Sequence, residues 1–202
     1  MRSLLSASAA VMLVAGCAAM RSAPPVRSFR VAYHPPDPGI AAPLPVTVRV
    51  VPFGIAAVYD RESFVYRNGP YDVGVDTYNR WISSPASMIT DLLARDLAAS
   101  HAVEAVLQAP SALSNDYELN GYVETLEERD DNGCSAHLRL REFLVRVPRH
   151  GARQVVQHGD YTGDEPCTLG DPESYVAAMS RAVEQVSEQI RAAILAVIAA
   201  GP

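Results

Sequence analysis

The residues that could support catalysis or metal binding are spread along the sequence without a recognisable spacing. The sequence has no Gly-x-Ser-x-Gly elbow for a serine nucleophile, no Gly-rich phosphate loop and no His-Glu-x-x-His pair for zinc. Its histidines are scattered, at His34, His101, His137, His150 and His158. We therefore expect no catalytic residue, no metal ligand and no cofactor.

Two acidic groups leave one enzymatic hypothesis open. Asp130-Asp131 and Asp160, Asp164 and Glu165 lie near predicted turns, where solvated loops are their simplest interpretation. A catalytic pair of carboxylates needs no fixed spacing in sequence, so a periplasmic hydrolase stays an alternative. Such an enzyme would need a concave pocket with converging polar groups and shifted pKa values.

The first residues have the pattern of a secretion signal. Arg2 precedes an apolar run at 4–14, which is too short for a membrane helix of roughly 20 residues and typical of a signal peptide. The run leads into Val14-Ala15-Gly16-Cys17, which resembles the bacterial lipobox, where the cysteine is lipidated and becomes the first residue of the mature protein. An ordinary signal peptide that happens to contain a cysteine is the alternative.

This pattern predicts a division of the chain into three parts. We expect a signal peptide at 1–16, the lipidated Cys17 with its tether at 17–27, and a single domain at 28–202. Ala18 follows the cysteine, in place of the Asp that resembles an inner-membrane retention signal. The anchor is therefore expected in the outer membrane, with the domain on its periplasmic face.

The other two cysteines are predicted to form a disulfide, because the periplasm is oxidising. Two predicted strands, 138–147 and 153–161, flank a His150-Gly151 turn, and a two-residue turn ending in Gly is typical of a hairpin. Opposed residues then have a constant sum of numbers, 301, and Cys134 and Cys167 have the same sum. A bulge near Glu142 would explain a change of apolar parity in the first strand and would shift this register by one.

Hydrophobic periodicity predicts strands and two helices. Ser84-Pro85 and Asp171-Pro172 each combine a capping residue with a proline suited to the first helical position. The first helix should end near Ser100, and its Asp91 and Arg95 are spaced for an ion pair. The predicted strands are 28–33, 46–51, 64–66, 71–81, 103–107, 117–126, 138–147 and 153–161, with an acidic turn at 127–133. This order predicts an α+β fold of two layers, an antiparallel or mixed sheet with two helices packed on one face.

Composition narrows the class of partner. The formal charge is −6, which argues against nucleic acid, because phosphate binding needs clustered positive charge. Hydrophobic residues make up 49% of the chain and charged residues 20%, as in a globular protein that buries a core.

A set of aromatic and arginine residues follows a fixed order up to the first helix. It comprises a strand at 29–33, a strand closed by Pro52, Tyr59-Asp60-Arg61, Val65-Tyr66-Arg67 and Arg80-Trp81. From Cys17 to about Ser100, this order resembles the ABC-type transport auxiliary lipoprotein family, the PqiC-like lipoproteins that accompany MCE-domain lipid transporters. The second half fits that family only as strands followed by a long final helix.

The resemblance implies a non-catalytic outer-membrane lipoprotein. It would dock a periplasm-spanning MCE protein that an inner-membrane ABC permease and ATPase drive, and MCE rings allow a homo-oligomer. Trp, Tyr and Arg dominate binding hot spots, so the predicted partner-binding residues are Tyr59, Asp60, Arg61, Arg80 and Trp81. Alternatively, Trp81 packs in the core and Arg61 pairs with an acid. A structural lipoprotein that helps assemble another outer-membrane complex is the second functional hypothesis.

Overall fold

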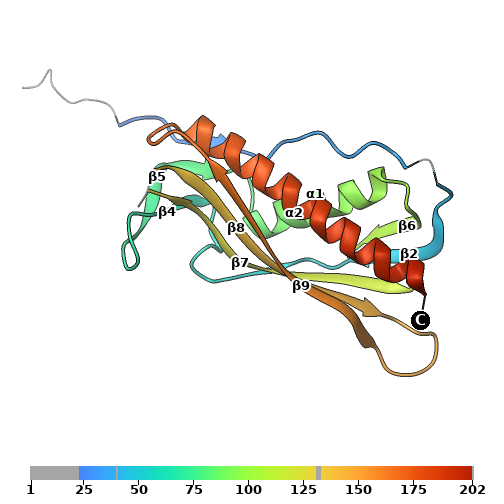
Figure 1. Cartoon of the computed structure of the whole chain (residues 1–202). Helices are drawn as coiled ribbons and strands as arrows, with labels where there is room; N and C mark the ends of the chain where they lie inside the picture. Colours follow the sequence, from blue (N-terminus) through green and yellow to red (C-terminus); the bar gives the residue numbers. More distant parts are fainter. Residues whose placement is uncertain (1–22, 40, 131–132, 202) are drawn as a thin grey trace, which may run out of the picture.

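The computed structural model describes residues 23–39, 41–130 and 133–201, so the predicted signal peptide and Cys17 lie outside the described residues. A mixed sheet of nine strands forms one layer, and two helices cover one of its faces (Figure 1). The predicted α+β class is confirmed. The strands are β1 (Arg27–Phe29), β2 (Leu44–Val50), β3 (Gly54–Ile55), β4 (Ser63–Arg67), β5 (Val73–Trp81), β6 (Val103–Gln108), β7 (Tyr117–Arg129), β8 (Ser135–Arg146) and β9 (Gln154–Pro166), and the helices are α1 (Pro85–Ala99) and α2 (Pro172–Ala200).

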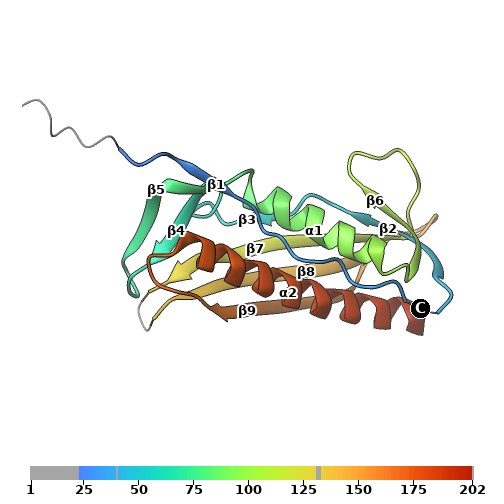
Figure 2. The same ribbon diagram turned by 90° about the horizontal axis from the view of Figure 1, so that it is seen from above.

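The sheet is organised around the long strand β7. β2, β3 and β4 pair with β7 in parallel, whereas β8 pairs with it antiparallel. β5 lies antiparallel to β4, β1 pairs in parallel with the end of β5, and β6 lies beside β2. The face turned toward the helices carries the core, and the opposite face has no helix over it (Figures 1 and 2). We call this uncovered side of the sheet the open face.

Helix α1 begins where the sequence predicts, but two polar details differ. Pro85 occupies the first turn, yet the Ser84 side chain makes no capping hydrogen bond. Arg95 pairs with the adjacent Asp96, at 2.7 Å, instead of with Asp91. Asp91 accepts a hydrogen bond from Gln108 of β6. The predicted Asp91–Arg95 pair is therefore wrong, because the buried Asp96 carboxylate attracts the guanidinium more strongly than a solvated one does.

Helix α2 has the predicted cap and the predicted apolar stripe. The Asp171 carboxylate accepts hydrogen bonds from the backbone N–H groups of Glu173 and Ser174, at 3.0 and 3.2 Å, which satisfies two free donors of the first turn. Met179 and Val186 are among the residues of the stripe with no exposed surface. The stripe packs against β8 and β9, so the helix covers its own sheet.

Strands β8 and β9 form a hairpin whose register matches the predicted one. Paired residues sum to 301 from Ser135–Pro166 to Leu144–Gln157. Cys134 and Cys167 lie one step beyond and form the predicted disulfide, with their Cα atoms 4.9 Å apart. The register shifts after Leu144 instead of near Glu142, because Glu142 stays on the buried side of β8 with its leucine neighbours.

Two predicted elements have different bounds in the structure. The first strand, predicted at 28–33, ends at Phe29, because the backbone N–H of Ala32 donates to the Ser180 side chain of α2 instead of to a neighbouring strand. The chain then crosses over the helices as an extended segment (Figure 2). The acidic turn predicted at 127–133 starts too early, since β7 continues to Arg129 and Glu127 is buried. None of the helices among the described residues is long and apolar enough to span a membrane.

Candidate functional site: buried anchors and an exposed edge

The five predicted partner-binding residues divide into two buried and three exposed side chains. Tyr59 and Trp81 lie in the core, with 5% and 1% of their surface exposed. For Trp81 this agrees with the alternative of core packing, and direct contact with a partner is no longer proposed for either residue because both side chains are almost wholly buried. Asp60, Arg61 and Arg80 are exposed and stay candidate contact residues.

Trp81 ends β5 inside an aromatic cluster. Its ring centroid lies 4.4 Å from that of Phe64 in β4 and 5.8 Å from that of Tyr175 in the first turn of α2. Phe29 of β1 packs on Phe64, at 5.5 Å. Tilted and edge-to-face contacts of this kind stabilise a core beyond the area that they bury. Trp81 thus joins the β1–β5–β4 edge to α2, which is a structural role.

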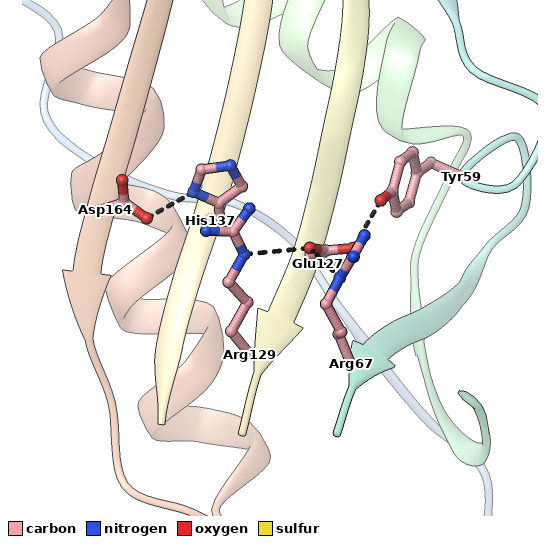
Figure 3. Close-up of polar contacts among 6 residues, drawn as sticks. All are labelled: Tyr59, Arg67, Glu127, Arg129, His137 and Asp164. Atoms are coloured by element: carbon pink, nitrogen blue, oxygen red, sulfur yellow. Dashed lines mark hydrogen bonds and ion pairs between the residues drawn. The ribbon is translucent and has the colours of Figure 1, made fainter. Parts of the chain in front are cut away.

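Tyr59 belongs to a second buried cluster, centred on a carboxylate of β7 (Figure 3). Glu127 has no exposed surface. It accepts hydrogen bonds from the Tyr59 hydroxyl at 2.5 Å, from Arg67 Nε and Nη2 at 2.8 and 3.1 Å, and from Arg129 Nε at 3.1 Å. Tyr59, in the loop before β4, and Arg67, at the end of β4, thereby fix this loop and strand to β7.

The charges in this cluster are arranged to keep Glu127 ionised. Burial alone would raise the pKa of Glu127, but the hydrogen bonds from Arg67, Tyr59 and Arg129 outweigh it and hold this pKa below its usual value. Burial and the hydrogen bond to Glu127 raise the pKa of Tyr59, and the same carboxylate raises the pKa of Arg67. A carboxylate that already accepts four hydrogen bonds is a poor general base, so this cluster stabilises structure.

A histidine–aspartate pair lies beside this cluster on the open face. His137 of β8 is opposite Glu127 in the register and Asp164 of β9 is opposite His137. His137 Nδ1 lies 2.5 Å from Asp164 Oδ1 (Figure 3). In the part of the chain that the structure describes, no serine, threonine or cysteine side chain hydrogen-bonds to His137. The pair therefore resembles only part of a catalytic triad, and it links β8 to β9.

Two other glutamates have raised pKa values, and the sequence gives no sign of either. Burial raises the pKa of Glu142 to about 8, with an opposing effect from nearby Gln157. Gln157 donates to Tyr161, and neither Glu142 oxygen has a hydrogen-bond partner among the described residues. Burial and the negative charges of neighbouring acids raise the pKa of Glu128 to about 7.

The two glutamates with raised pKa values, Glu128 and Glu142, do not line the surface hollows described next. An open hollow of about 800 Å³ lies at the end of α2 and includes Glu104, Asp116, Arg146 and Arg149 in its lining. A second, of about 330 Å³, lies at the extended segment 33–37 and is lined in part by Asp96. The carboxylate of Asp96 already accepts hydrogen bonds from Tyr33, Ser187 and Arg95. Neither hollow is lined by Glu128 or Glu142.

One group of side chains has a geometry that could suggest a metal. Glu128, Cys134 and Cys167 place one oxygen and two sulfur atoms within 4.8 Å of one another. Both sulfur atoms belong to the disulfide, which removes the thiolates that a metal would need. Within residues 23–39, 41–130 and 133–201, no other group of this kind occurs.

The sequence did not predict Arg67 or Glu127 as members of a buried polar cluster. Arg67 belongs to the ordered set of aromatic and arginine residues that carries the family resemblance. Its role became clear only from its hydrogen bonds to Glu127 in the structure. Glu127 itself follows a bulge in β7, between Val123 and Thr125, which changes the face on which the later residues of the strand lie. The alternation of Leu119, Gly121 and Val123 therefore could not be extended to it.

Comparisons with known proteins give the family and the fold. The model of a family described as ABC-type transport auxiliary lipoprotein component matches residues 33–191. A crystal structure of a protein from Xanthomonas campestris is similar with a TM-score of 0.70 and 21% identity, over 80% of this chain and 91% of that one. A hypothetical protein from Chlamydia trachomatis is similar with a TM-score of 0.51 and 10% identity, over 78% and 99%. Among curated proteins, none matches the sequence.

Proposed function

The chain belongs to the family of ABC-type transport auxiliary lipoprotein components, and we propose that it is anchored in the outer membrane and holds a periplasm-spanning MCE protein there. Membership makes it a lipoprotein component of an ABC-type transport system, which implies a membrane-anchored protein that faces the periplasm and has a transporter as its partner. The family match over residues 33–191 is the observation that carries this proposal. The membrane, the partner and the mode of contact are the steps beyond it.

The anchor in this proposal is Cys17. The lipobox pattern at Val14-Ala15-Gly16-Cys17 and the Ala18 that follows it support acylation and the outer membrane. Residues 17–27 then serve as the tether, and 28–202 act as one domain. Several acyl chains on one cysteine give a stable anchor, whereas a single chain binds only marginally and reversibly.

A non-catalytic role agrees with the chemistry of the buried acids. Asp96 and Glu127 are saturated by hydrogen bonds from arginine, tyrosine and serine side chains. Glu142 has no exposed surface through which a substrate could reach it. These observations give Asp96, Glu127 and Glu142 structural roles, as expected for a non-catalytic component.

The proposed contact surface consists of Asp60, Arg61 and Arg80. These side chains are exposed, and buried neighbours hold each of them in place, since Asp60 and Arg61 follow Tyr59 and Arg80 precedes Trp81. The two segments meet at the β4–β5 pair, where Trp81 N donates to Glu62 O at 2.7 Å. Exposed charges on a rigid support lose little conformational entropy on binding, which suits a docking surface.

The test is affinity purification of the tagged, lipidated protein from membranes, followed by mass spectrometry. We expect an MCE protein and its ABC permease and ATPase to copurify. The double substitution Arg61→Ala and Arg80→Ala should reduce their recovery. The matched double control is Arg146→Ala and Arg149→Ala, two arginines that line the hollow at the other end of α2.

The outcomes separate the hypotheses. Recovery of an outer-membrane barrel or secretion subunit in place of an MCE protein would favour a role in assembling another complex. Recovery of no partner would contradict docking and reopen the hydrolase hypothesis. Equal recovery with the Arg61/Arg80 variant and with wild type, when both are folded, would exclude this surface and leave the family assignment intact.

A further inference from the structure

Exposed apolar side chains gather at the end of the domain where the tether enters. The end patch consists of Val26, Tyr71, Val73, Val75, Tyr78 and Ile82. These six are half of the large apolar residues that the described part of the chain exposes, and Tyr71 is 97% exposed. Concentrated exposure of this kind marks a binding surface, whereas isolated exposed apolar residues are ordinary.

The members of the end patch follow β5 from the turn before it to the residue after it. Val73, Val75 and Tyr78 belong to β5, Tyr71 lies in the turn before it, and Ile82 follows it. β1 pairs with Asn79–Trp81 at the end of β5, which brings Val26, the residue before β1, beside the same strand. Both views show β5 and the incoming chain at one end of the molecule, with the end of α2 at the other (Figures 1 and 2).

We propose that the end patch rests on the lipid bilayer to which Cys17 is attached, with Tyr71 and Tyr78 at the level of the headgroups. This inference rests on the anchor in the proposed function and adds a second, non-covalent contact of the domain with the membrane. Because Arg80 lies on β5 between Tyr78 and Ile82, it also places the proposed docking surface at the membrane-facing end of the domain. Tyrosine suits this position because its ring is apolar and its hydroxyl keeps contact with water.

The length of the tether favours the membrane as the occupant. Nine residues lie between Cys17 and Arg27, and a fully extended chain covers at most about 35 Å over these ten residue steps. Helix α2 has 29 residues and is therefore about 43 Å long. The tether thus keeps the start of β1 within about 35 Å of the bilayer, whereas it allows the far end of α2 to lie about a helix length farther away.

The backbone of β5 disfavours a partner strand at this edge. β1 covers only Asn79–Trp81, so an added strand would have to pair with the preceding residues. There, the Asp76 carboxylate accepts hydrogen bonds from the backbone N–H groups of Tyr78 and Asn79, at 2.7 and 2.9 Å. The strand also breaks register with β4 in this region. At most Val73–Val75 are then left to pair with an added strand, so we expect the exposed side chains to make most of the contact.

The acidic residues near the end patch have polar partners, but only the partner of Glu173 carries a positive charge that reduces repulsion from anionic lipids. Asp72 accepts a hydrogen bond from Asn68, and Asp76 accepts from Asn79. At the start of α2, Glu173 forms an ion pair with Arg27 of β1.

The test attaches the mature chain, starting at Cys17, to vesicles through a maleimide headgroup lipid. Cys134 and Cys167 are in the disulfide and do not react. The vesicles contain phosphatidylethanolamine and phosphatidylglycerol, with or without bromine atoms on the acyl chains. The reporter is Tyr71→Trp, and the matched control is Tyr122→Trp, a tyrosine 43% exposed on β7. Trp81, 1% exposed, gives the same background in both.

We expect brominated lipid to quench the emission of Tyr71→Trp and to shift it to the blue, with no change in Tyr122→Trp. Hydrogen exchange of the unsubstituted chain should also slow in Val73–Trp81 when the chain is tethered. Emission from Tyr71→Trp that is equal in both kinds of vesicle, together with unchanged exchange, would overturn the proposal. Equal quenching of both reporters would also overturn it, because the domain would then have no preferred face.

The chemical attachment separates this inference from the proposed function. It does not depend on acylation of Cys17 in the cell or on capture of an MCE protein. Quenching of Tyr71→Trp would therefore support the membrane contact even if the copurification failed. Copurification of the transporter with no quenching would leave the docking role and remove the membrane contact.

Discussion

Two glutamates without exposed surface lie on neighbouring strands, and their pKa values are shifted in opposite directions. Glu127 on β7 accepts hydrogen bonds from Tyr59, Arg67 and Arg129, and its pKa is lowered. Glu142 on β8 has no hydrogen-bond partner among the described residues, and burial raises its pKa to about 8. Equal burial thus gives opposite charge states near neutral pH, and the number of donors decides which.

The two faces of the sheet explain the difference. Glu127 lies on the open face, where arginines from neighbouring positions reach it while part of each side chain stays in water. Glu142 lies on the face that α2 covers, between Leu140 and Leu144, which have no exposed surface. Its register partners are Gly121 and Gly159, which have no side chains to donate a hydrogen bond.

The largest expected effect comes from removing the main partner of Glu127. Arg67→Ala should destabilise the domain by about 4 kcal/mol, because it leaves a buried carboxylate without its bidentate cation. Urea unfolding of the periplasmic domain, with the disulfide intact, measures this loss. A loss below about 1 kcal/mol would mean that Tyr59 and Arg129 alone satisfy Glu127, and that the comparison with Glu142 overstates the need for donors.

Glu142→Gln should have the opposite sign and depend on pH. The unfolded carboxyl titrates near 4.5 and the folded one near 8, so the stability of the wild type falls as pH rises from 4.5 to 8. At pH 7, the variant should be more stable by about 3 kcal/mol, because one pKa unit corresponds to about 1.4 kcal/mol. At pH 4 the two should be equal.

Unfolding midpoints of both proteins, measured between pH 4 and pH 9, test this prediction. The control is Glu104→Gln on β6, an exposed glutamate that should show no difference over this range. A wild type whose stability does not change between pH 4.5 and 8, relative to Glu142→Gln, would show that the folded carboxyl ionises freely.

Local signals explain which parts of the fold the sequence could predict. A capping residue followed by proline marked both helix starts, and the index sum of one turn placed Cys134 opposite Cys167. These features depend on residues near in sequence or joined by a single hairpin. The parallel pairings of β2, β3 and β4 with β7 have no such local signal, because long connections separate the strands.

The two glutamates show where prediction of the site fails. Glu127 was expected in a solvated turn. Its burial depends on hydrogen bonds from Tyr59 and Arg67, which are distant in the sequence. A bulge was expected near Glu142, since the parity of the apolar residues changes there along the predicted strand. Glu142 is buried because α2 packs over this face of β8, and the residues next to Glu142 in the sequence do not predict that packing. Tyr59 was predicted at a contact surface, and Trp81 was predicted either there or in the core, because residue type alone does not distinguish an anchor of the core from a hot spot.

A smaller change removes one donor and keeps the shape of the cluster. Tyr59→Phe should cost about 1.5 kcal/mol at pH 7, because it deletes one hydrogen bond to a charged group. It should also raise the pKa of Glu127. The stability that depends on ionised Glu127 is present above the unfolded pKa of about 4.5 and is lost as pH falls. The loss should therefore begin at a higher pH in the variant.

Unfolding curves at pH 7 and at several values below pH 4.5 measure both effects. Tyr66→Phe in β4 is the matched control, a tyrosine whose hydroxyl makes no hydrogen bond to a described residue. If Tyr59→Phe and Tyr66→Phe behave alike, the Tyr59 hydroxyl contributes nothing, and the low pKa of Glu127 comes from the two arginines alone.

The smallest effect is expected for an arginine on the same open face that pairs outside the core. Arg139 Nε lies 2.9 Å from Glu124 Oε2, as close as Arg67 lies to Glu127, but its side chain is 47% exposed and that of Glu124 21%. Arg139→Ala should cost at most about 1 kcal/mol, and added salt should reduce this cost further. The same urea experiment in low and high salt measures it. A cost close to that of Arg67→Ala would show that distance alone sets the strength of these pairs, whereas a small cost attributes the difference to the burial of the carboxylate.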